Sequence, residues 1–244
     1  MRFVACLHTA ESNIALFEAV KPASIILNHT ARAELLREAE AAGGMTGPIA
    51  TRTRDALAAL SGDAVLLTCS TLGPAAKPPA QRVDAALAEA ATRQGGWVVV
   101  LVALQTTLAP TRAIFAEGAE RQDATVEICM VPDAWAAFRA GDLARYHALV
   151  AAAAAAAFAE GAAQVALALA SLAPAAALFG ARRPLTNEPQ RRPRRRAVMT
   201  GAATSTAQMR CSLRRPRCRN VSLLVFPRCW SAPAPAAALR WTCG

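Results

Sequence analysis

The chain has 244 residues and a formal net charge of +10, and 54% of its residues are hydrophobic although only 5% are aromatic. This length allows one sizeable core or two small ones. The first residues contain no charged segment followed by an apolar signal segment, so we expect a cytoplasmic protein. The alanine-rich stretch 146–179 carries Glu160 and Gln164 in its interior. We therefore expect a helix and a strand there, not a membrane span.

The positive charge lies in the C-terminal tail. Up to Ala181 the chain has 13 Lys and Arg residues against 16 Asp and Glu residues. From Arg182 onward, 14 arginines face the single acidic residue Glu188. This division predicts an ordered body over residues 1–188 and a basic, irregular or disordered tail over 189–244 that is not a domain.

In chain order, short β-branched runs alternate with longer segments that have helical spacing. We expect strands at 2–8, 23–28, 63–69, 96–104, 125–131 and 164–170. We expect helices at 13–20, 31–43, 53–62, 79–95, 111–122 and 142–161. Repeated alternation of strand and helix predicts an α/β fold with parallel sheets flanked by helices.

Polar side chains gather where these strands end. In parallel sheets, ligands bind beyond the carboxyl ends of the strands, close to unpaired backbone N–H groups. The polar residues at these ends are His8, Thr9, Ser12, Asn13, Asn28, His29, Thr68, Cys69, Ser70, Thr71, Gln105, Thr106, Thr107 and Ser171. This collection of hydroxyls and amides with one thiol predicts a site for a small anion.

Four of these segments together carry a family resemblance. They read HTAESNIALFE at 8–18, LLTCSTLGPAA at 66–76, LVALQTTLAPT at 101–111 and VALALASLAP at 165–174. In order and spacing they resemble the aspartate/glutamate racemase superfamily, which includes hydantoin racemase, maleate isomerase and arylmalonate decarboxylase. The resemblance implies two pseudo-symmetric lobes, approximately 1–95 with a C-terminal contribution and 96–188. It also implies a cofactor-independent site between them, and it allows a homodimer.

The same resemblance implies a mechanism in which two cysteines face each other across the carbon next to a carboxylate. Cys69 matches the first of them. The motif of the second, Leu-Gly-Cys-Thr, aligns with residues 167–170, where Leu169 replaces the cysteine. Leucine cannot exchange a proton, so we predict a single-thiol, racemase-like or isomerase-like enzyme for a small amino acid or dicarboxylate. The expected substrate-binding residues are His8, Ser12, Asn13, Ser70, Thr71, Thr106, Thr107 and Ser171.

The same residues also allow interpretations in which they have a structural role and no catalytic one. Cys69 could be a buried, inert cysteine, and the threonines at 106 and 107 could cap a helix. If a helix begins near Pro74, the dipole of that helix would lower the pKa of the Cys69 thiol. The second hypothesis is a catalytically silent carboxylate-binding protein. No metal site is expected, because the three histidines are scattered along the sequence and no paired Cys/His motif typical of a metal site is present.

The tail supports three readings of its own. The segment RRPRRR at 191–196 could bind nucleic acid, which we rank third among the functions because the basicity is confined to this part. Its four cysteines lack a paired C-x-x-C arrangement, which disfavours a zinc module. We favour a frameshift near residues 188–190, since alanine codons read one base out become arginine and proline codons.

Overall fold

The computed structural model describes residues 1–179 and 183–186. The predicted tail at 189–244 lies outside the described residues. The strands are β1 (Arg2–His8), β2 (Ile25–Ala31), β3 (Ala64–Leu67), β4 (Ala80–Arg82), β5 (Gly96–Val102), β6 (Ala124–Met130), β7 (Gln164–Leu167) and β8 (Leu185–Thr186). The α-helices are α1 (Ser12–Val20), α2 (Ala33–Ala41), α3 (Gly47–Ala58), α4 (Val83–Thr92), α5 (Leu108–Gln122), α6 (Ala134–Arg139) and α7 (Leu143–Ala159). Short 3-10 segments are η1 (Gly73–Ala75), η2 (Gln105–Thr107) and η3 (Ala170–Leu178).

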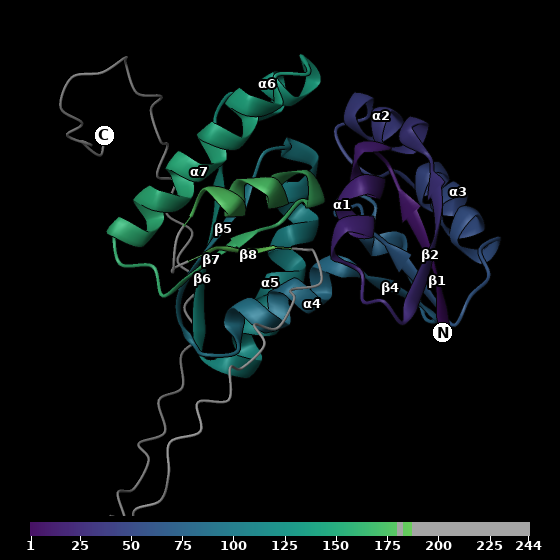
Figure 1. The fold of residues 1–244 in the computed structure, drawn as a ribbon, viewed down its shortest axis with the longest axis horizontal. Helices are drawn as coiled ribbons and strands as arrows, with labels where there is room; N and C mark the ends of the chain where they lie inside the picture. Colours follow the sequence, from purple (N-terminus) through teal and green to yellow (C-terminus); the bar gives the residue numbers. More distant parts are fainter. Residues whose placement is uncertain (180–182, 187–244) are drawn as a thin grey trace, which may run out of the picture.

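These strands form two four-stranded sheets, one in each of two lobes that lie side by side (Figure 1). The first sheet has the order β2-β1-β3-β4 and the second the order β6-β5-β7-β8. Every paired strand is parallel to its neighbour. The second lobe thus repeats the strand order of the first, which confirms the predicted α/β class and its pseudo-symmetry.

The central strand of the second sheet shows why the sequence folds this way. Strand β5 reads GWVVVLV, and its side chains from Val98 to Val102 are all buried. A strand in the middle of a parallel sheet is covered on both faces, so an uninterrupted apolar run suits it better than alternation. One face packs on α6 and α7 through Val99 and Leu101. The other packs on α4 and α5 through Val98 and Val100.

The first sheet is covered differently on its two faces. Ala5 and Leu7 of β1 pack in an apolar cluster with residues of α2 and α3, including Leu35 and Ile49. The opposite face of β1 lies under α1, where the ring of Phe17 contacts His8 at 5.4 Å between centroids. Because side chains alternate along a strand, the polar residues of β1 share this second face.

The turn after α2 illustrates how the predicted helix ends are made. Gly43 and Gly44 adopt φ angles of +72° and +156°, which suit glycine because it lacks a Cβ. The N–H of Gly44 donates to the carbonyl of Ala39 at 2.7 Å, closing the last turn.

The structure departs from the sequence expectations in several places. The helix expected at 53–62 spans Gly47–Ala58, and strand β8 was not expected. The predicted helix at 79–95 begins only at Val83, because residues 80–82 pair with β3 as strand β4. Helix α6 was not expected. Helix α4 lies on the first-lobe side of the boundary expected at residue 95, yet its Leu87 and Ala88 pack in the core of the second lobe.

No helix within the described ranges is both long and apolar enough to cross a membrane.

Candidate functional site

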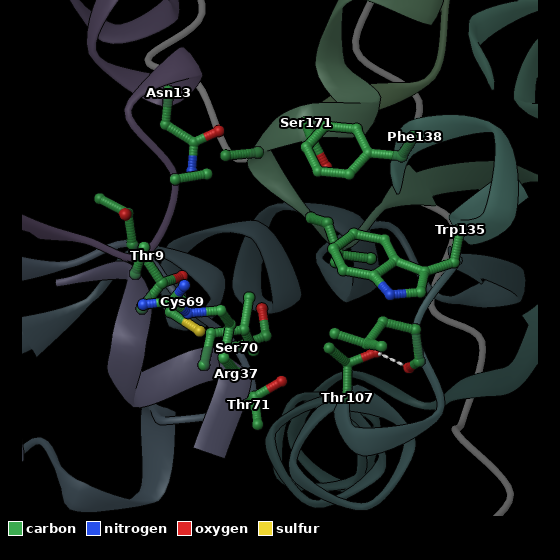
Figure 2. Close-up of a pocket in the computed structure, with 17 residues that line it drawn as sticks. Thr9, Asn13, Arg37, Cys69, Ser70, Thr71, Thr107, Trp135, Phe138 and Ser171 are labelled. Carbon is green, nitrogen blue, oxygen red and sulfur yellow. Dashed lines mark hydrogen bonds between the residues drawn. The ribbon is translucent and has the colours of Figure 1, made fainter. Parts of the chain in front are cut away.

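A cavity of about 140 Å³ opens between the two lobes, at the carboxyl ends of the strands (Figure 2). The first lobe contributes the loops after β1 and β3 together with α1 and α2, and the second contributes the segments after β5 and β7 together with α6. The first-lobe residues are Thr9, Ala10, Asn13, Ala33, Leu36, Arg37, Thr68, Cys69, Ser70 and Thr71. The second-lobe residues are Leu104, Thr107, Trp135, Phe138, Leu169, Ala170 and Ser171. The lining therefore brings together segments that are far apart in the sequence.

Most of the side chains expected at a site meet here. The predicted residues that line the cavity are Cys69, Asn13, Ser70, Thr71, Thr107 and Ser171. The predicted residues His8, Ser12 and Thr106 are not part of its lining. The sequence analysis did not select Arg37, Trp135 or Phe138, because these residues lie on helices and not at strand ends.

Among the described residues, Cys69 is the only one that brings a thiol to the lining of this cavity, and its side chain is partly exposed. Burial raises the pKa of the Cys69 thiol above its ordinary value. The hydroxyl of Thr9 and the backbone N–H groups of Leu72 and Thr71 favour the charged sulfur and so oppose this effect. The negative charge of Asp84 reinforces it. The resting side chain is therefore a neutral thiol with three donors converging on it.

The expected lowering of the Cys69 pKa by a helix dipole is wrong. Only the three-residue segment η1 follows the loop that carries Cys69, and α4 begins at Val83. The donors that face the sulfur are the loop amides of Thr71 and Leu72, not the N-terminus of an α-helix. Loop amides stabilise a thiolate once it forms, but here they do not outweigh the cost of burial.

His8, which we expected to contact substrate, points away from the cavity. It is fully buried under α1, with Nδ1 2.9 Å from Thr68 Oγ1 and Nε2 2.8 Å from His29 Nδ1. Burial and the neighbouring His29 lower the pKa of His8 to about 4. As the last residue of β1, its side chain falls on the face that carries Cys6, two positions earlier.

The other two predicted residues outside the lining have different surroundings. Ser12 is exposed at the first position of α1. The hydroxyl of Thr106 lies 3.1 Å from that of Thr71, so Thr106 contacts a residue of the lining without lining the cavity itself.

Three polar contacts tie the lobes together around the cavity. Besides the Thr71–Thr106 pair, the hydroxyl of Ser70 donates to the carbonyl of Ala168 at 2.9 Å. The indole Nε1 of Trp135 donates to Glu40 Oε1 at 2.7 Å. These contacts join residues 35 to 98 positions apart and fix the distance between the two walls.

The second-lobe wall is largely apolar. Trp135 and Phe138 (Figure 2) stack with centroids 4.9 Å apart. Leu169 also lines the cavity from this lobe. The hydroxyl of Ser171 is 2.8 Å from that of Tyr146. Burial raises the pKa of Tyr146, which keeps its phenol neutral. No side chain of this wall among the described residues is an acid or base at neutral pH.

Asn13 supplies an unused acceptor. The residue is 6% exposed, and its Oδ1 has no hydrogen-bond partner among the described residues. A buried oxygen without a partner costs about 1–3 kcal/mol, so a ligand that donates a hydrogen bond there would recover this energy.

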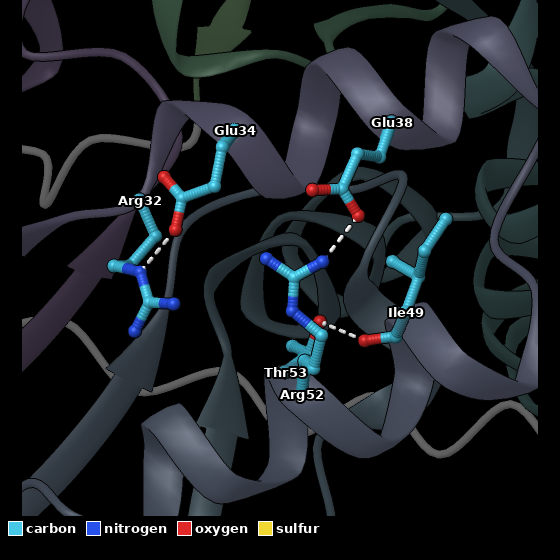
Figure 3. Close-up of polar contacts among 6 residues, drawn as sticks. All are labelled: Arg32, Glu34, Glu38, Ile49, Arg52 and Thr53. Atoms are coloured by element: carbon cyan, nitrogen blue, oxygen red, sulfur yellow. Dashed lines mark hydrogen bonds and ion pairs between the residues drawn. The ribbon is translucent and has the colours of Figure 1, made fainter.

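Arg37 brings a positive charge to the cavity. Its neighbours on α2 are occupied: Glu34 pairs with Arg32, and Glu38 pairs with Arg52 of α3 (Figure 3). Arg37 has no carboxylate partner within the described part of the chain. A guanidinium in this state is suited to bind a ligand carboxylate.

A second cavity, of about 390 Å³, lies within the first lobe beside α3. Its described lining is mainly aliphatic and contains no thiol, hydroxyl or imidazole. Although larger, it brings no thiol, hydroxyl or imidazole together with its cations Arg54 and Lys77, so the interlobe cavity is the candidate site.

Comparison with known proteins supports the fold. No protein-family model matches this sequence, and no curated protein does. Among solved structures, the chain is similar to the aspartate racemase of Picrophilus torridus, with a TM-score of 0.60 and 10% sequence identity. The match covers 77% of this chain and 89% of that one. At this identity the likeness shows a racemase-like fold and nothing about the reaction.

Proposed function

We propose that the interlobe cavity binds a small carboxylate, such as an amino acid or a dicarboxylate, and that Cys69 exchanges a proton at the carbon next to it. The observation that carries this proposal is the position of the thiol. It opens into the cavity beside the Thr9 hydroxyl and the amides of Thr71 and Leu72, which favour its charged form. These donors stabilise the sulfur when it becomes negatively charged.

The surrounding side chains indicate how the substrate is held. The guanidinium of Arg37 is available for a carboxylate group. Asn13 Oδ1 lacks a donor and fits an amino or amide N–H of the ligand. The volume of about 140 Å³ suits a molecule of few heavy atoms. An amino acid presents both groups at one carbon, so it satisfies Arg37 and Asn13 together.

The proton transfer starts from the ionised form of Cys69. The resting thiol first loses its proton to solvent, and the thiolate then takes the proton from the α-carbon while the electron pair left on carbon delocalises into the carboxylate. The same thiol then returns a proton, after exchange with solvent, to the same face of that carbon. Leu169 in the opposite wall has no proton to give. The proposed outcome is therefore exchange with retention of configuration, without racemisation.

Incubation in deuterated water tests this proposal. Candidate amino acids and dicarboxylates are followed by proton NMR for loss of the α-proton signal, and by chiral chromatography for configuration. We expect exchange with retention in the wild type, its loss in Cys69→Ser, and no change in Cys129→Ser. Cys129 is the matched control, since it is also partly buried but lies in β6 outside the cavity. Exchange that persists in Cys69→Ser, or product of inverted configuration from the wild type, would contradict the proposal.

A second candidate is binding of a carboxylate without turnover. The raised pKa of Cys69 and the apolar residue at position 169 favour it. In that case, calorimetry would detect a carboxylate ligand whose affinity falls in Arg37→Met, while no substrate would show α-proton exchange at any pH.

A further inference from the structure

Outside the cavity, the first sheet places one thiol and two imidazoles against each other. Cys6 and His8 lie two positions apart on β1, so they share a face of the sheet. The parallel register sets His29 of β2 directly opposite Cys6. All three side chains therefore fall on the face covered by α1. Their ligating atoms lie within 4.8 Å of one another.

We propose that Cys6, His8 and His29 form a binding site for a transition-metal ion, with Zn²⁺ as the best fit. Imidazole nitrogen and thiolate sulfur are both ligands that Zn²⁺ accepts, and three protein ligands leave a fourth position for water. No metal site was expected because the histidines are scattered along the sequence. Cys6 and His8 are two positions apart, but His29 joins them only through the register of β1 on β2.

The inner nitrogens already face each other. His8 Nε2 and His29 Nδ1 are 2.8 Å apart and share a hydrogen bond. Zinc–nitrogen bonds of about 2.0–2.1 Å in a tetrahedral site need the two nitrogens roughly 3.3 Å apart. The required opening is about half an ångström. His29 lies on the edge strand β2, with 12% of its side chain exposed, and can move by this amount.

The other ring nitrogen of each histidine has an oxygen partner, as is usual for histidines that bind a metal. His8 Nδ1 lies 2.9 Å from Thr68 Oγ1, whose hydroxyl also contacts the carbonyl of Leu7 at 3.1 Å. His29 Nε2 lies 3.2 Å from Glu18 Oε1. Such oxygen partners orient each ring so that its other nitrogen points to the metal. Both rings are thus turned with one nitrogen inward before any metal arrives.

The surroundings also supply a negative charge. The carboxylate of Glu18, with 40% of its side chain exposed, lies beside His29 and also pairs with Lys21 at 2.8 Å. When the metal–sulfur bond forms, the thiol proton of Cys6 leaves to solvent. The site is separate from Cys69, but Thr68 belongs to both: it contacts His8 and lines the cavity.

Cobalt(II) titration of the full chain, kept reduced and without oxygen, tests this site. A thiolate bound to cobalt produces a charge-transfer band in the near ultraviolet, and Zn²⁺ should displace it. We expect Cys6→Ala to remove one equivalent of this band. Because the chain contains other cysteines, including those of the tail, the matched controls are Cys129→Ala and Cys69→Ser, which should keep that equivalent.

Two further variants separate metal binding from folding. His29→Gln changes a partly exposed side chain and should abolish tight binding while the circular dichroism spectrum stays unchanged. Glu18→Gln should weaken cobalt binding about 10- to 100-fold, as expected for loss of a carboxylate that orients a ligating histidine. The proposal is overturned if the wild type gives no band, or if the band is the same in folded Cys6→Ala or His29→Gln protein.

Discussion

Introducing a cysteine at position 169 is the most direct test of the proposed proton transfer in the cavity. Leu169 lies in the second-lobe wall, partly buried against both clusters of that lobe. A thiol there would face the substrate from the side opposite Cys69. We expect Leu169→Cys to convert a substrate of one configuration into a mixture of both, where the wild type only exchanges its α-proton.

The cost of this change in stability can be estimated from burial. Leucine to cysteine removes about two methylene equivalents, each worth about 0.8 kcal/mol when fully buried. Because Leu169 is only partly buried, we expect a loss of about 1 kcal/mol in the free energy of unfolding. For a chain of this size that corresponds to a fall of about 2–4 °C in Tm. The variant should therefore fold and remain testable.

The assay combines chiral chromatography of the product with thermal unfolding. A Leu169→Ala variant is the matched control, since it also removes side-chain volume but supplies no thiol. The reasoning would be refuted if the folded Leu169→Cys protein still exchanged the α-proton on one face only. It would be refuted equally if the wild type or Leu169→Ala produced both configurations.

Three further predictions follow from the same geometry. Because burial raises the pKa of Cys69, the rate of α-proton exchange should still rise about tenfold per pH unit at the ordinary thiol pKa of about 8.5. NMR in buffers of increasing pH measures this rate, and a plateau reached below pH 8 would contradict the prediction. Arg37→Met should raise KM, or the Kd of a bound carboxylate, about tenfold. Arg52 pairs with Glu38 instead, so Arg52→Met should leave both constants unchanged. Equal effects of the two variants would show that Arg37 does not bind the carboxylate. Phe115→Ala should lower the free energy of unfolding in urea by about 3–5 kcal/mol, because Phe115 is fully buried in the second lobe, whereas Phe3→Ala at a side chain 47% exposed should cost under about 1 kcal/mol.

Several features of the candidate site could be predicted from strand ends alone. Parallel strands present their carboxyl ends at one edge, so Cys69, Ser70, Thr71, Thr107 and Ser171 were expected to meet, and all five line the cavity. Arg37, Trp135 and Phe138 gave no such signal. They reach the cavity because α2 and α6 pack at its rim, and helix packing is not visible in local sequence patterns.

The sequence by itself determined the layered α/β architecture, because hydrophobic periodicity is a local property that each segment carries alone. It also determined the chemistry available at residues 69 and 169, since a side chain's capacity to carry a proton does not depend on the fold. The tertiary structure decided which of these groups act together. Strand register turned His8 away from the cavity and set His29 opposite Cys6, and burial raised the pKa of Cys69 where a helix dipole had been expected to lower it. Register and burial arise only when distant segments pack, so neither could be read from any one stretch of the chain.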